Sequence, residues 1–145
     1  MITERLLLTL WVGSLWAIGF IAVPMAFATL GDVNLAGNYA AKLFSVVNII
    51  GLASGVVLVL SKLFSHGKQV KSQWRFWLIV LMLVQTLFLH FYVQVEIESL
   101  KLLGQQSSEA FDRVHHIGSN VYLFLSVLGI VLVLSSDKVI NNGQK

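Results

Sequence analysis

The sequence contains no cysteine, a single proline and few charged residues. Of its 145 residues, 12% are charged, about half the share of about 25% in a typical soluble domain. The absence of cysteine excludes a disulfide scaffold, thiolate zinc sites and iron–sulfur clusters. Hydrophobic residues make up 57% of the chain, which excludes a disordered protein. What is left is one bundle-sized unit whose solvent is lipid.

Four long apolar stretches fill most of the chain. They cover residues 6–30, 43–64, 76–95 and 117–134. A membrane-spanning helix needs about 20 apolar residues, whereas barrel strands are about 10 residues long and alternate in polarity. None of the four stretches alternates, and the connections between them are short. The sequence therefore predicts an all-α membrane protein with a single transmembrane domain over residues 1–145, an antiparallel four-helix bundle.

The basic residues are distributed unequally between the two sides of this predicted bundle. Seven lie with the N-terminus, the second connection and the C-terminus: Arg5, Lys62, Lys68, Lys71, Arg75, Lys138 and Lys145. The other side holds Lys42, Lys101 and Arg113. This bias predicts cytoplasmic termini in the inner membrane. The net charge of +3 is then a topology signal, and no nucleic-acid partner is expected. Trp74 and Trp77 are expected at the inner interface, with Trp11 as a further candidate.

Small residues and the proline mark predicted packing positions. Gly51 and Gly55 form a G-x-x-x-G motif, which lets a neighbouring helix approach closely, and Asn48 shares their face. In the first stretch, Gly19 belongs to a track of small residues. Pro24 removes a backbone donor and is expected to kink the helix.

Polar residues in the third stretch follow a helical spacing. Thr86, His90 and Gln94 are four residues apart and are expected on one face, with Gln85 beside it. Two interpretations of His90 remain open. It can bond to a neighbouring helix, as polar residues in membrane bundles often do, or it can bind a ligand, metal ion or proton.

A second group of polar residues begins the fourth stretch. His115 and Ser119 share one helical face, and His116 and Asn120 share another. The histidines can serve as interfacial anchors or caps. Alternatively, His90, His115 and His116 are candidate ligands for a metal ion or haem, since neutral imidazole is a common ligand.

Motifs of catalysis are missing from the sequence. It contains no H-E-x-x-H and no G-x-S-x-G. No charged residue lies at the middle of a stretch, where ion-coupled transporters usually place one. The favoured hypothesis is a non-enzymatic accessory, scaffold or interaction protein without a cofactor, in contact with lipid and with a membrane-protein partner or further copies of itself. The alternative is a metal- or haem-handling protein, and a weaker one is transport of small solutes or lipids by an oligomer.

Three blocks of the sequence resemble a known family. They are LTLWVGSLWAIGF at 8–20 with VP at 23–24, AG at 36–37 with AKLF at 41–44, and FDRVH at 111–115. They resemble the transmembrane-protein-205-like family of small bacterial inner-membrane proteins, domain of unknown function 4149. The resemblance implies a four-helix membrane protein and no established activity. A eukaryotic relative is associated with platinum-drug resistance, which hints at export or metal handling, and the histidine of the family's last block corresponds to His115.

Overall fold

The computed structural model describes residues 2–135, all of them in helices or short connections. The α-helices are α1 (Ile2–Trp16), α2 (Val23–Thr29), α3 (Val33–His66), α4 (Trp74–Phe88), α5 (Gln94–Leu102) and α6 (Glu109–Leu134). Two π-helical segments, η1 (Ala17–Ala22) and η3 (Leu89–Val93), join α1 to α2 and α4 to α5, and a 3₁₀ segment, η2 (Gly67–Ser72), follows α3. Lys138 and Lys145, which entered the charge distribution, lie outside the described residues.

Four of the resulting helical stretches are long and apolar enough to cross a membrane. They are Ile2–Thr29, Val33–Ser65, Trp74–Leu102 and Glu109–Leu134. Only 22–33% of the most apolar part of each stretch is buried inside the bundle, so most of its residues are at least partly exposed. Soluble monomers rarely expose such large apolar surfaces. The helices therefore indicate a multi-pass membrane protein, and the predicted all-α membrane class is confirmed.

Helices α3 and α6 begin well before their apolar stretches because polar side chains cap their first turns. The Asp32 carboxylate accepts hydrogen bonds from the backbone N–H groups of Asn34 (2.7 Å) and Leu35 (3.1 Å), which starts α3. The Ser108 hydroxyl accepts a bond of 3.1 Å from the N–H of Phe111 and starts α6. Such caps satisfy backbone donors that a helix leaves free at its beginning. The connections are consequently shorter than the polar segments of the sequence.

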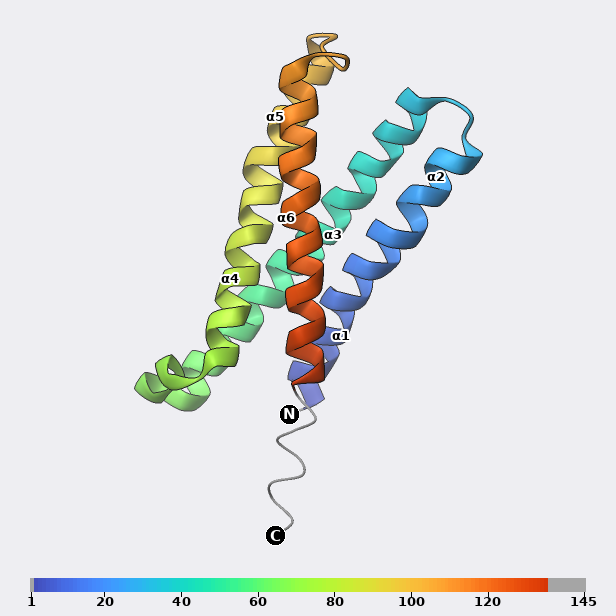
Figure 1. Cartoon of the computed structure of the whole chain (residues 1–145). Coiled ribbons are helices and arrows are strands. Elements are labelled where there is room, and N and C mark those ends of the chain that lie inside the picture. Colours follow the sequence, from blue (N-terminus) through green and yellow to red (C-terminus); the bar gives the residue numbers. More distant parts are fainter. Residues whose placement is uncertain (1, 136–145) are drawn as a thin grey trace.

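The four stretches pack into one bundle. Helix α3 contacts α1 and α4, and α6 contacts the same two helices. Figure 1 shows the start of α1, the η2 segment and the end of α6 at the lower end of the molecule, and the α2–α3 and α5–α6 connections at the upper end. Leu15, Ile79, Met82, Leu125 and Leu132 form the centre of the core and are fully buried.

The tryptophans occupy two different environments. Trp74 and Trp77, at the start of α4, are 56% and 53% exposed, as interfacial residues are. Trp11 is 0% exposed and belongs to the core. The expectation that Trp11 joins the interfacial group is therefore wrong. Helix α3 covers the face of α1 that carries Trp11. The position of a residue along the first stretch does not show which face a neighbouring helix covers.

Candidate functional site

The last turn of α4 carries a side-chain amide without a partner among the described residues. Gln85 lies at the centre of the apolar stretch 76–95, and its Oε1 atom is buried with no hydrogen-bond partner among the described residues. The neighbouring Thr86 differs, because its hydroxyl donates a bond of 2.8 Å to the carbonyl oxygen of Met82 within the same helix. Lipid offers no replacement for a missing hydrogen bond. The described residues therefore leave the Oε1 atom of Gln85 without a hydrogen-bond donor.

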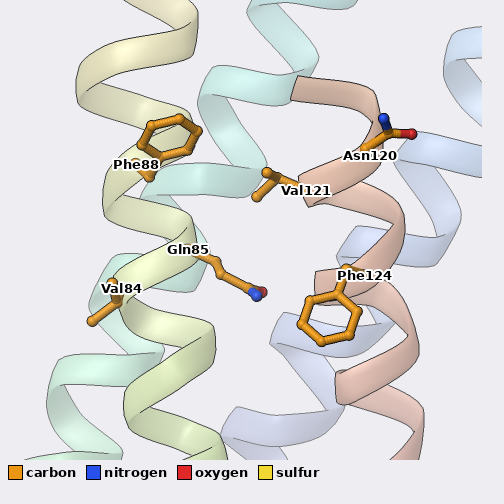
Figure 2. Close-up of a pocket in the computed structure, with 6 residues that line it drawn as sticks. All are labelled: Val84, Gln85, Phe88, Asn120, Val121 and Phe124. Atoms are coloured by element: carbon orange, nitrogen blue, oxygen red, sulfur yellow. The ribbon is translucent and has the colours of Figure 1, made fainter. Parts of the chain in front are cut away.

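Gln85 reaches into a groove between α4 and α6. The groove has a volume of about 420 Å³ and is lined by Val84, Gln85 and Phe88 of α4 and by Asn120, Val121 and Phe124 of α6. Figure 2 shows the Gln85 amide extending from α4 toward Phe124, whereas the Asn120 amide points away from it. The walls of this groove are therefore apolar, and the Gln85 amide is the polar group that extends into it.

His90 lies one turn further along, in the π-helical segment η3. Its side chain is half-buried, its ring stands edge-on to Phe91 with centroids 4.9 Å apart, and its Nδ1 atom is buried without a hydrogen-bond partner among the described residues. Single π-helical turns inside α-helices are rare and occur frequently at functional sites. The structure thus leaves both interpretations of His90 open.

His115 and His116 are exposed at the start of α6. His115 stacks on Phe111 with ring centroids 6.2 Å apart, and its centroid lies 6.3 Å from that of His116. The Ser119 hydroxyl donates a bond of 2.9 Å to the carbonyl oxygen of His115, which satisfies the hydroxyl within its own helix. Among the described residues, no group of three or more metal-binding side chains comes together.

The register between α6 and the α4–α5 stretch separates His90 from the other two histidines. Gly118 packs against Val93, and Gly129 packs against Met82. Counting along α6 from these contacts places His90 near residue 121, about five residues from His116, which corresponds to about 7.5 Å along the axis. The three histidines therefore lie at two depths.

Asn48 belongs to a polar link between α3 and the α4–α5 stretch. Its Nδ2 atom donates a bond of 3.4 Å to Oε1 of Gln94, and Nε2 of Gln94 donates one of 3.2 Å to the carbonyl oxygen of Ala41. Asn48 is 4% exposed. Gln94 thus has the partners that Gln85 lacks, although both amides lie in the same helical stretch.

The glycines of the G-x-x-x-G motif lie against the indole of Trp11. A methyl group at Gly51 would lie 2.5 Å from Nε1 of Trp11. One at Gly55 would lie 3.1 Å from Cη2 and 3.2 Å from Cζ3 of the same ring, and 2.8 Å from Cδ1 of Leu83. The motif therefore faces α1 and α4 at once. What fills the space above the glycines is a tryptophan ring rather than a second backbone.

Gly19 lies inside the π-helical segment of the first stretch, and Pro24 follows that segment by two residues. Pro24 is the second residue of α2, and just before it the N–H of Val23 bonds to the carbonyl oxygen of Ile18, five residues back. Proline has no N–H for an α-helical bond, and irregular turns commonly absorb this loss. Inside the segment, the ring of Tyr122 from α6 packs directly on Gly19.

The sequence-based interpretation missed a charged cluster at the lower end of the molecule in Figure 1. Oε1 of Glu4 lies 3.0 Å from Nζ of Lys62 and 3.6 Å from Nη2 of Arg75. The sequence indicated this cluster only through Glu4, an acidic residue on the side that is predicted to hold most of the basic residues. Assigning charged residues to one side of the bundle does not show which of them form ion pairs.

A comparison with protein families identifies the chain. A family model described as a domain of unknown function (DUF4149) matches residues 6–106. The chain belongs to the DUF4149 family. This finding confirms the family that the opening block predicted, and the matched part contains Gln85, His90 and the Asn48–Gln94 link. The resemblance at residues 111–115 lies beyond the match and stays a prediction, as does the relation to transmembrane-protein-205-like proteins. No curated protein and no solved structure matches the chain.

Proposed function

We propose that this DUF4149 protein is an integral inner-membrane protein that acts without catalysis, as an accessory or interaction protein for another transmembrane helix. One observation carries the proposal: the amide of Gln85 projects into the α4–α6 groove, at the middle of an apolar stretch, with its Oε1 atom unpartnered. Rotation of the amide about its last side-chain bond would turn Oε1 toward the groove, where a partner helix with a hydrogen-bond donor at this depth would satisfy it.

An antiparallel bundle with both termini in the cytoplasm is the arrangement that we propose for the membrane. The contacts between α3 and the α4–α5 stretch support it, since Gly55 meets Leu83 while Gly37 accepts a bond from Lys101. Residue numbers thus rise along one helix as they fall along the other. The excess of basic residues on the side of the N-terminus supports the orientation, by the positive-inside rule.

A transmembrane helix suits the groove better than lipid does. Acyl chains carry no hydrogen-bond donor, so the Gln85 amide stays unsatisfied when lipid fills the space beside Phe88 and Phe124. A side-chain hydrogen bond between membrane helices is worth about 1–2 kcal/mol in model peptides. The apolar walls add contact area for side chains of a partner helix. Both features favour a helix with one polar residue among apolar ones.

Site-specific photo-crosslinking in native membranes tests this proposal. A photoreactive amino acid at Val84, on the groove wall, should give a discrete protein adduct that is lost in a Gln85→Leu background. The matched control is Val56, which is exposed on α3 at nearly the same depth, and which should crosslink to lipid alone. The mass of the adduct shows whether the partner is a second copy or another protein. Lipid adducts alone at both positions, regardless of residue 85, would contradict the proposal.

Binding of a metal ion or haem by His90 is the second candidate function. The buried, unpartnered Nδ1 atom in a π-helical turn favours it. Because His115 and His116 lie at another depth, His90 needs a ligand from outside the chain to complete a coordination sphere. Transport by an oligomer has no comparable observation behind it among the described residues and stays a prediction.

A further inference from the structure

The charged cluster of Glu4, Lys62 and Arg75 joins three helices at one end of the bundle. One carboxylate of α1 faces a lysine of α3 and an arginine of α4, at 3.0 and 3.6 Å. The side chains are 24%, 12% and 18% exposed, respectively. Two cations against one anion leave a positive charge uncompensated. The Nε atom of Arg75 is also buried without a hydrogen-bond partner among the described residues.

A small hollow of about 50 Å³ opens beside this cluster, between α1 and α3. Its polar wall holds the hydroxyls of Thr3, Ser61 and Ser65 together with Glu4 and Lys62. Hydroxyls and an ammonium group are hydrogen-bond donors that can surround an anion. A volume of this size accommodates a group of a few atoms.

The other wall of the hollow is apolar and lies deeper in the bundle. It consists of Leu7, one turn after Thr3 on α1, and of Val57 and Leu58, one turn before Ser61 on α3. Polarity therefore changes along the helix axis, from hydroxyls and a cation at the end to hydrocarbon inside. A phospholipid changes in the same order, from phosphate to acyl chain.

We infer that this hollow binds the phosphate of an anionic phospholipid, with Lys62 as its cationic contact and the hydroxyls of Ser61 and Ser65 as donors. The positive charge left over by Glu4 provides the attraction, and lysine binds phosphate as a point charge. Basic pockets between transmembrane helices bind lipid headgroups by this chemistry. The inference uses neither Gln85 nor the α4–α6 groove, so it stands apart from the proposed partner helix.

The opposite end of the bundle offers no comparable site among the described residues. There, Nζ of Lys101 donates to the carbonyl oxygen of Gly37 and to Oδ1 of Asn38, at 3.3 and 3.2 Å. Arg113 pairs with Glu109 on the surface of α6. These cations are engaged with the protein itself, whereas the cluster at the other end keeps a surplus of charge beside a hollow.

Native mass spectrometry of the delipidated full-length chain tests the inference. Phosphatidylglycerol should bind at least about fivefold more tightly than phosphatidylcholine with the same acyl chains, because the surplus positive charge of the cluster repels the choline cation that follows the phosphate in phosphatidylcholine. Lys62→Gln should reduce this preference to less than about twofold. Lys42→Gln, which removes an exposed lysine at the opposite end, should leave it unchanged.

A double variant guards against loss of fold in Lys62→Gln. Ser61 and Ser65 are exposed, so Ser61→Ala with Ser65→Ala should keep the helix content while weakening phosphatidylglycerol binding about threefold to tenfold. Equal binding of both lipids, or equal losses in Lys62→Gln and Lys42→Gln, would overturn the inference. Inorganic phosphate at millimolar concentration should not displace the lipid, and displacement would show that the site takes the free anion instead.

Discussion

The hydroxyl of Tyr122, in the middle of α6, donates a hydrogen bond of 2.6 Å to the backbone carbonyl oxygen of Leu15, in the last turn of α1. The first stretch turns π-helical two residues later, at Ala17. Gly19 faces the same ring, and a methyl group there would lie 2.8 Å from the Tyr122 oxygen. A side chain that inserts against a helix backbone is one of the recognised causes of a local distortion. The irregular turn and the anchoring of α6 therefore occur at one place.

Gly19→Ala should destabilise the protein by about 1–2 kcal/mol, because its methyl group overlaps with the buried ring of Tyr122. The matched control is Gly13→Ala on α1, where a methyl group meets nothing within 4 Å. There the higher helix propensity of alanine should leave stability unchanged or raise it by up to about 1 kcal/mol. Unfolding of the purified protein in detergent measures both variants. Equal changes in stability for the two variants would show that the packing of the Tyr122 ring does not require a glycine at position 19.

Gly51→Ala should cost about 1–3 kcal/mol of unfolding free energy, because the methyl group would lie 2.5 Å from Nε1 of the fully buried Trp11. The indole is enclosed by the core and has no room to move away. Gly37→Ala is the control within the same helix, since nothing lies within 4 Å of its methyl group. Unfolding of both variants, followed by Trp fluorescence or by heating, measures the change in stability. Unchanged stability in Gly51→Ala would refute the tight contact with Trp11.

The spans were predictable from the sequence because membrane crossing depends on local properties, namely length and apolar composition. The packing spacing of Gly51 and Gly55 is also local, and it was recognised. What fills that space was not, since the partner of the two glycines is Trp11, from another helix. A tryptophan near the end of an apolar stretch carries the same local signal whether it faces a neighbouring helix or the interface.

The polar residues of the third stretch show a second limit of prediction from the sequence. Thr86, His90 and Gln94 are spaced by four, which predicts one face on a regular α-helix. The π-helical segment Leu89–Val93 interrupts this phase. Thr86 bonds within its own helix while Gln94 reaches Asn48 on α3. The sequence also does not distinguish Gln94 from Gln85, because only the arrangement of helices decides which amide has partners.

Replacing these two glutamines by leucine should have different effects on the isolated chain. Gln94→Leu removes a bond to Asn48 and one to the carbonyl oxygen of Ala41, and it should cost about 1–2 kcal/mol, a typical loss for such bonds. Gln85→Leu removes an unpartnered amide from an apolar setting and should leave stability unchanged or raise it. Unfolding free energies in detergent compare the variants. A loss in Gln85→Leu as large as in Gln94→Leu would reveal an internal partner for Gln85.

The metal or haem hypothesis predicts a bound group in gently purified protein. If His90 is a ligand, the wild-type chain carries a metal in elemental analysis or a haem band in its absorption spectrum, and His90→Ala removes it. Exposed His116, about 7.5 Å away along the axis, supplies the control variant, because His116→Ala should retain the group. Gently purified wild-type protein that contains neither metal nor haem would contradict the hypothesis.

The Glu4 cluster and the Glu109–Arg113 pair, at opposite ends of the bundle, should contribute very differently to stability. Glu4 is partly buried between Lys62 and Arg75, so Glu4→Gln leaves two cations facing each other and should cost about 2–4 kcal/mol, as the loss of one partner from a buried pair does. Glu109 and Arg113 form a pair on the surface of α6, with side chains 92% and 70% exposed, and exposed pairs of this spacing are worth about 0.3–0.5 kcal/mol. Glu109→Gln is therefore the control, and its effect should also shrink in high salt. Unfolding at low and high ionic strength measures both, and similar losses in the two variants would mean that Glu4 is solvated rather than enclosed by the three helices.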